Sequence, residues 1–206
     1  MRHSALAFLL LSSCAGGGVG AVPRYPWVED HGLALAREEL VLDVERDGSV
    51  RVTADFHFAA RASWRDRVMT FPVATPRGAT RDFRAELMGS RPHALPVAPS
   101  EPDRLPVGEA AETWDLWVPG AELERHGGWL RVSYAQPGAG SFAYTLKSGA
   151  YWSGPIERLE VVLRDPHARV AALWLEGERV PTRGGPRVQV VLVDVEPDEG
   201  VRLELR

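Results

Sequence analysis

Apolar and polar side chains alternate along most of this chain, and this period-two pattern constrains the fold more than any other feature. From Glu39 the alternation is regular on both sides of Asp47-Gly48. The apolar face before this turn consists of Leu40, Leu42 and Val44, and the apolar face after it of Val50, Val52, Ala54, Phe56 and Phe58. Alternation on both sides of an Asp-Gly pair predicts a β-hairpin.

Further alternating segments follow, with turn residues between them. They span 68–73, 81–88, 112–118, 129–136, 141–147, 156–164, 169–175, 178–181, 187–195 and 201–206. Only 121–126 resembles a helical turn, so we expect no helical crossovers and antiparallel pairing. The pattern predicts an all-β fold, an antiparallel β-sandwich of roughly ten to twelve short strands. Segment 187–195 is apolar on both faces, which is typical of a strand buried on both sides.

Composition is that of an ordinary globular protein. Of 206 residues, 45% are hydrophobic and 25% are charged, which favours one folded domain over two small ones and argues against disorder. The net charge is −4, and the arginines are interleaved with acids. This arrangement indicates a solvated mixed-charge surface and excludes a nucleic-acid partner.

The N-terminus has the features of an export signal. Arg2 and His3 precede an apolar run at 5–11 and then Leu11-Ser12-Ser13-Cys14, and the run is too short to span a bilayer. The last four residues resemble the lipobox of bacterial lipoproteins. That resemblance implies removal of a signal peptide, 1–13, and acylation of Cys14, the only cysteine. Residues 14–30 would then form a lipidated, Gly-rich tether, and 31–206 the β-sandwich domain.

Ordinary secretion is the alternative, because Val19-Gly20-Ala21 also fits a small-residue cleavage site. Cleavage there would discard Cys14 and release the protein outside the membrane or into the periplasm. The expected location is otherwise the cell envelope, on the exported side of a membrane to which the lipid anchors the chain.

Several landmarks between residues 31 and 165 carry a second resemblance. They are Gly32-Leu33, an acidic strand ending near Glu45, an F-x-F strand, Phe71-Pro72, Trp129 to Tyr134, and Tyr144-x-Leu146-x-Ser148-Gly149-x-x-Trp152-x-Gly154-x-Ile156. In this order they resemble a group of exported bacterial proteins built on a domain of unknown function. The resemblance implies an exported β-rich domain and no particular activity.

The polar residues form no recognisable catalytic or metal-binding pattern. The histidines at 31, 57, 93, 126 and 167 are dispersed, and none makes a ligand pair by local spacing. Asp55-x-His57 comes closest and is interpreted as an exposed polar strand face. The serines of Ser148-Gly149 and Ser153-Gly154 lack a nucleophile-elbow motif. We therefore expect no cofactor, no metal and no enzymatic activity.

The aromatic residues are the feature with functional promise. Of the seven tryptophans, Trp114 and Trp174 are assigned to the core. Trp117 and Trp129 project from the faces opposite the main apolar rows of their strands, and Tyr151-Trp152 lies in a loop between two strands. Exposed aromatics mark a partner or glycan surface; the alternative is a second buried sheet face with the loop packed onto the core.

Two functions follow from these observations. The first is a non-enzymatic, envelope-anchored β-sandwich that binds an envelope protein or helps to assemble an envelope complex. The second is a carbohydrate-binding module in which Tyr151, Trp152 and Trp117 stack on a polysaccharide. A hydrolase is a third possibility, because fold does not determine function.

Overall fold

The computed structural model describes residues 33–60, 64–74, 79–100, 112–138, 140–146, 155–182, 186–196 and 200–206. These residues form fourteen strands and one short helix. The elements are β1 (Leu33–Val44), β2 (Val50–Ala60), β3 (Arg67–Val73), β4 (Arg81–Leu87), β5 (His93–Ala94), β6 (Val97–Pro99), β7 (Glu112–Val118), α1 (Gly120–Arg125), β8 (Trp129–Gln136), β9 (Ser141–Tyr144), β10 (Ile156–Arg164), β11 (Val170–Leu175), β12 (Glu178–Val180), β13 (Arg187–Val195) and β14 (Val201–Leu205).

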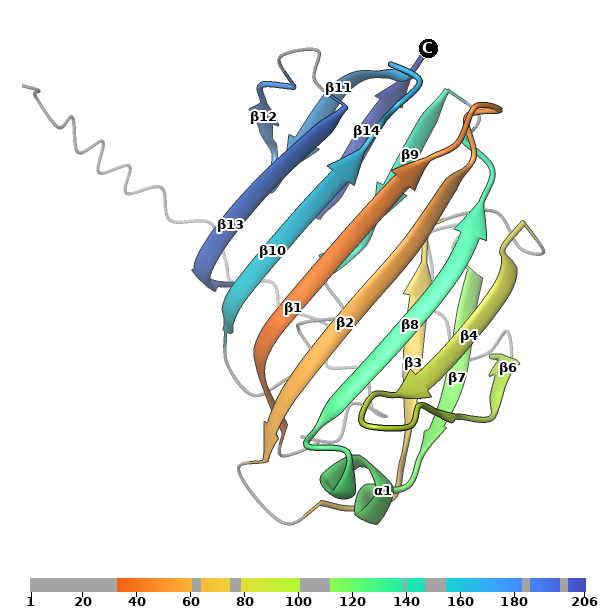
Figure 1. Ribbon diagram of the computed structural model, residues 1–206, viewed down its shortest axis with the longest axis vertical. Coiled ribbons are helices and arrows are strands. Elements are labelled where there is room, and N and C mark those ends of the chain that lie inside the picture. The colour runs from red at the N-terminus through yellow and green to blue at the C-terminus, as the bar shows by residue number, and fades with distance from the viewer. Residues whose placement is uncertain are drawn as a thin grey trace, which may run out of the picture.

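The strands are arranged in three sheets that pack as a sandwich (Figure 1). One layer is a seven-stranded sheet with the order β13-β10-β1-β2-β8-β4-β5. The other layer holds a four-stranded sheet, β12-β11-β14-β9, and a three-stranded sheet, β3-β7-β6. The expectation of an all-β sandwich is confirmed.

The pairing of β1 with β10 departs from the expected antiparallel pattern. These central strands run parallel, from Arg37 opposite Arg158 to Asp43 opposite Arg164, whereas every other strand pair in the described sheets is antiparallel. Parallel neighbours need a long connection between them, and here eleven residues of β2 and seven further strands intervene before β10. The expectation rested on consecutive strands alone, and so it was wrong for this pair.

The expectation for β13 is also wrong, because β13 is the edge strand of the seven-stranded sheet. The apolar residues on both faces of 187–195 predicted burial on both sides. Instead, exposed and half-buried positions alternate along it, and Val191 and Val193 are exposed on its outer face. Its inner face packs against the core through Val188, Val190, Leu192 and Val195, which are only partly buried.

A β-bulge sets which residues of β1 point into the core. The register with β2 shifts between Leu35 and Arg37, and one extra residue reverses the alternation of a strand. Leu33 and Leu35 are therefore buried before the bulge, and Leu40, Leu42 and Val44 after it. The same alternation directs Glu38 inward, where it is 0% exposed.

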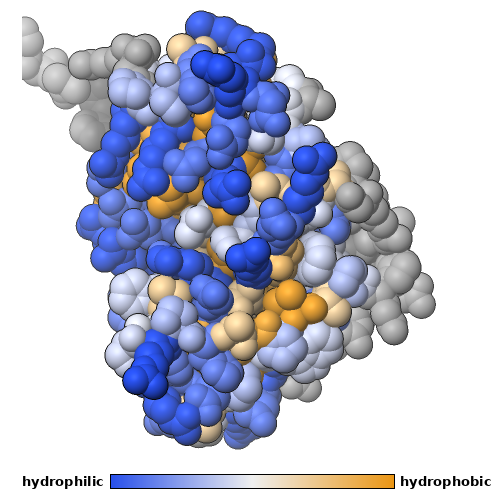
Figure 2. All heavy atoms as spheres, turned by 45° about the vertical axis from the view of Figure 1, so that its right-hand side comes forward, coloured by the Kyte–Doolittle hydropathy of each residue, from blue (hydrophilic) through white to orange (hydrophobic). Residues whose placement is uncertain are grey.

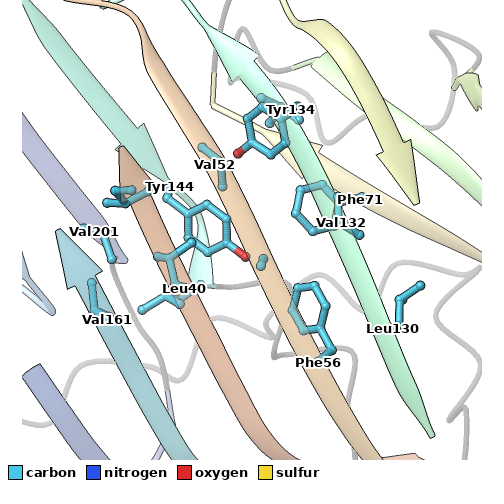
Figure 3. Packing of buried hydrophobic residues seen from close by; sticks show 14 of the residues in the cluster. Leu40, Val52, Phe56, Phe71, Leu130, Val132, Tyr134, Tyr144, Val161 and Val201 are labelled. Carbon is cyan, nitrogen blue, oxygen red and sulfur yellow. The ribbon is translucent and has the colours of Figure 1, made fainter. Parts of the chain in front are cut away.

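Aromatic rings from both layers meet in the core (Figure 3). Phe71 of β3 is surrounded by four rings, with centroid separations of 5.8 to 6.4 Å: Phe56, Phe83, Tyr134 and Tyr144. Trp114 packs against this core and stacks on Phe83 at 4.5 Å, as expected of a core tryptophan.

Trp174 does not lie in the core, contrary to the sequence-based assignment. Its neighbours Leu173 and Leu175 point into the core, so Trp174 lies on the outer face of β11. There the guanidinium of Arg202, its cross-strand partner, lies 5.6 Å from the ring centroid. A guanidinium at this distance from an indole ring gives a cation–π contact.

The turn between β10 and β11 depends on one buried carboxylate. Both oxygens of Asp165 accept backbone hydrogen bonds, from Arg169 N at 2.8 Å and Val170 N at 2.7 Å. Asp165→Ala is expected to lower the free energy of unfolding by about 1–3 kcal/mol, because two amides lose their acceptor. Asp43→Ala is the control, since the exposed Asp43–Arg164 pair contributes about 0–1 kcal/mol. Equal losses in urea denaturation of the two variants would contradict this interpretation.

Candidate interaction surface

Three exposed apolar side chains lie near one end of the sandwich, on strands next to α1. In the described part of the chain, the large apolar residues with exposed side chains are Val68, Trp117, Trp129, Val191 and Val193. The first three belong to the ends of β3, β7 and β8 that adjoin α1, at the bottom of Figure 1. We call Val68, Trp117 and Trp129 the α1-end surface. The face shown in Figure 2 is mostly hydrophilic, with apolar patches in its upper and middle parts.

Trp117 and Val68 form an apolar pair on the outer face of the three-stranded sheet. They lie directly opposite each other in the β3–β7 register. Trp114, Leu116 and Val118 point toward the core from the other face of β7, so alternation turns Trp117 to solvent, where it is 44% exposed. Its backbone N–H donates to the carbonyl oxygen of Pro96 at 3.2 Å. The ring therefore stands on a rigid, hydrogen-bonded strand.

Trp129 begins β8 on the outer face of the seven-stranded sheet. It is 46% exposed and lies opposite His57 of β2, with ring centroids 6.0 Å apart. Nε2 of His57 lies 3.1 Å from the carbonyl oxygen of Gly127. The indole thus has an imidazole beside it that is held by the turn before β8.

Helix α1 and its turn link the two tryptophans and are fixed tightly to the sandwich. The N–H of Gly120 donates to Asp66 Oδ1 at 2.8 Å. A Cβ on Gly120 would lie 2.4 Å from the carbonyl carbon of Arg65. Gly128, with φ +76°, similarly leaves no room beside the carbonyl oxygen of Phe58. These close approaches require glycine and fix the position of Trp129 relative to β3 and β7.

Three of the dispersed histidines also lie at this end, two of them side by side. His57 lies beside Trp129, and His126, which follows α1, lies 6.2 Å from His93 between ring centroids. Nε2 of His126 is 3.9 Å from Glu122 Oε2. Local spacing did not predict this grouping, because the residues come from three separate segments. The described residues nevertheless contain no group of three or more side chains suited to hold a metal ion.

Asp55 and His57 share a strand face but have separate partners. Asp55 accepts two hydrogen bonds of 2.7 Å from Arg131, and this contact raises the pKa of the Arg131 guanidinium. His57 contacts the Gly127 carbonyl oxygen instead. The arrangement is a bidentate ion pair beside a histidine that contacts the backbone, on a polar outer face.

One unusual group was not predicted from the sequence, the buried carboxyl of Glu38. Its Oε1 accepts a hydrogen bond from the Tyr144 hydroxyl at 2.9 Å. Neither Glu38 Oε2 nor the Tyr134 hydroxyl has a hydrogen-bond partner among the described residues. Burial raises the pKa of Glu38 to about 7, because the charged form loses its hydration. Extending the alternation of Leu40 and Leu42 backward by one step would have placed Glu38 inward.

The other predicted site residues divide into two groups. Trp117 is exposed, as the alternation of β7 predicts. Cys14, Tyr151 and Trp152 lie outside the described residues, as do the expected signal peptide and tether. Among the residues that the structure describes, no helix has the length and apolar character needed to cross a membrane.

No protein-family model matches the chain, and comparison with curated proteins gave no match. Distant similarity to solved structures exists. An aminopeptidase N family protein from Idiomarina loihiensis aligns over 82% of this chain and 29% of its own, with 11% identity and a TM-score of 0.43. An M1 zinc metallopeptidase from Deinococcus radiodurans aligns over 85% and 43%, with 13% identity and a TM-score of 0.40.

Yeast LTA4 hydrolase gives a third match, over 89% of this chain and 29% of its own, with 6% identity and a TM-score of 0.37. This chain thus spans less than half the length of each of the three structures. Similarity at this level carries no information about activity.

Proposed function

We propose that this protein is a non-enzymatic interaction module of the cell envelope, anchored through Cys14, that binds a protein partner across the α1-end surface. The observation that carries the proposal is the exposure of Val68, Trp117 and Trp129, three apolar side chains on the strand ends next to α1. Exposed aromatics on a rigid scaffold are typical anchors of protein interfaces. The hydrophilic surroundings supply the polar rim that such an interface requires.

A protein partner suits this surface better than a polysaccharide. Trp117 lies on the outer face of the three-stranded sheet and Trp129 on that of the seven-stranded sheet, so the two rings do not lie on one flat sheet face. A protein partner can extend around α1 and contact both. Val68 adds an aliphatic contact beside Trp117, which suits an apolar protein side chain. The second candidate function is carbohydrate binding by Tyr151, Trp152 and Trp117. It is kept because Trp117 is exposed.

Substitution of Trp117 tests the proposed surface. Trp117→Ala is expected to weaken capture of the envelope partner by at least about thirtyfold, the loss typical of a central aromatic anchor. Trp174→Ala, which removes an indole from a different sheet, should leave capture unchanged. The measurement is quantitative recovery from solubilised envelopes on immobilised full chain, with the melting temperature of each variant as a folding check. Equal recovery by both variants would contradict the proposal, and recovery of polysaccharide alone would favour the second candidate.

Anchoring is tested separately. Cys14→Ser is expected to move the protein from the membrane fraction to the soluble exported fraction, because the acylated thiol would be missing. Immunoblots of fractionated cells measure the change. An unchanged distribution would show that Cys14 does not anchor the chain.

A further inference from the structure

We propose that β13 pairs antiparallel with β13 of a second copy of this chain, joining the seven-stranded sheets of the two copies. The proposal is independent of the α1-end surface, because β13 carries none of its three residues. β13 is the edge strand farthest from β4 and β5 in the strand order. In Figure 1 it forms the left-hand edge of the front sheet.

The side chains of β13 do not suit an exposed edge. Edge strands are normally protected by charges, proline or short length. β13 is nine residues long, contains no proline or lysine, and carries the uninterrupted apolar run 190–193. On its outer face Val193 is 66% exposed, and on its inner face Val190 and Leu192 are only partly buried. An added strand would place cross-strand side chains directly beside those of β13 on both faces.

The backbone of β13 is available on one side. Within the described residues its only strand neighbour is β10. An open hollow of about 640 Å³ runs along Val191–Glu196 and reaches Glu176 of the β11–β12 turn. Unpaired backbone groups beside open space favour the addition of a strand.

The sequence of β13 is complementary to itself when the two-fold axis passes through Val191. Antiparallel pairing then places Val191 opposite its own copy, Val190 opposite Leu192, and Gln189 opposite Val193. Arg187 falls opposite Val195 and Asp194 opposite Val188, so no like charges meet. This self-complementarity selects a second copy as the occupant, since a two-fold axis brings identical edges together antiparallel.

Asp194 limits the length of the pairing. Its φ of 53° is left-handed, a conformation that interrupts a regular strand. Regular pairing about Val191 is therefore expected over residues 189–193.

Cross-linking at the axis tests the proposal directly. Val191→Cys is introduced into the full chain carrying Cys14→Ser, which removes the native thiol and the lipid anchor. Mild oxidation is expected to give a disulfide-linked dimer, because residues opposite each other in an antiparallel pair bring their Cβ atoms to about 4.5–5.5 Å. Val68→Cys, an exposed valine on a different sheet, serves as the control and should remain monomeric. Equal cross-linking of the two variants would overturn the proposal.

Charge at the axis provides the second test. Val191→Lys places two like charges opposite each other, so the dimer dissociation constant from sedimentation equilibrium should rise at least about tenfold. Val68→Lys should not change it. A Cys14→Ser chain that is monomeric at about 100 µM would overturn the proposal.

Discussion

Glu38→Gln is expected to stabilise the protein at pH 8 and to leave its stability at pH 4 nearly unchanged. Glutamine resembles the protonated carboxylic acid and can still accept the hydrogen bond from the Tyr144 hydroxyl. At pH 8 the native glutamate must either carry a charge in the core or bind a proton against the prevailing pH. Both cost free energy that glutamine does not.

The direction follows from the two pKa values of Glu38. Its pKa is raised from 4.5 to about 7 by burial, so between these values the folded protein binds more protons than the unfolded chain. Below pH 4.5 Glu38 is protonated in both the folded and the unfolded chain, and its burial does not lower the free energy of unfolding. As the pH rises from 4.5 to about 7, the free energy of unfolding falls. The total loss is about 3 kcal/mol, from about 1.4 kcal/mol for each pKa unit.

Urea denaturation of the native chain, Glu38→Gln and Glu39→Gln from pH 4 to pH 8 measures this effect. Glu39 is the matched control, because it is the next residue on β1 and lies on the outer face in an ion pair with Arg37. We expect the difference between the native chain and Glu38→Gln to grow across this range, and Glu39→Gln to follow the native chain. A constant difference would contradict a buried carboxyl that titrates near neutrality.

Phe71→Ala is expected to lower the free energy of unfolding by about 3–5 kcal/mol, the usual cost of deleting a buried phenyl ring. Phe71 contacts rings on β2, β4, β8 and β9. The resulting cavity would therefore loosen contacts between the seven-stranded sheet and the opposite layer. No single neighbour can fill the space, because the surrounding rings come from four different strands.

The matched control is Val68→Ala on the same strand. Val68 points to solvent, and exposed substitutions usually change stability by less than about 0.5 kcal/mol. Denaturant titration of the two variants measures the difference in their free energies of unfolding. The comparison requires that this free energy falls with denaturant concentration at the same slope in both variants. A loss below about 1 kcal/mol for Phe71→Ala would mean that this ring does not join the layers.

Local patterns predicted much of the fold. The hairpin at Asp47-Gly48 joins β1 and β2, and the expected bounds of β7, β8 and β10 match those of the structure. Each of these depends on alternation and turn residues within a short window. Trp117 is exposed for the same reason, since alternation places its side chain on the face of β7 opposite Trp114, Leu116 and Val118.

Long-range arrangement was not predictable in this way. Whether β13 is central or at an edge depends on how many strands join the sheet, which the side-chain pattern of one strand does not show. The parallel β1–β10 pair and the grouping of His57, His93 and His126 likewise arise from segments far apart in the chain. The assignment of Trp174 to the core failed because an indole on an outer face can be covered by a neighbouring arginine.

Site-specific photo-crosslinking in living cells tests the central claim most directly. A photoreactive amino acid is placed at position 117 or 129 in the full chain, and at position 84 on the exposed outer face of β4 as a control. The account predicts that positions 117 and 129 capture the same envelope protein and that position 84 does not. Capture of that protein equally from all three positions, or from position 84 alone, would contradict a partner bound at the α1-end surface.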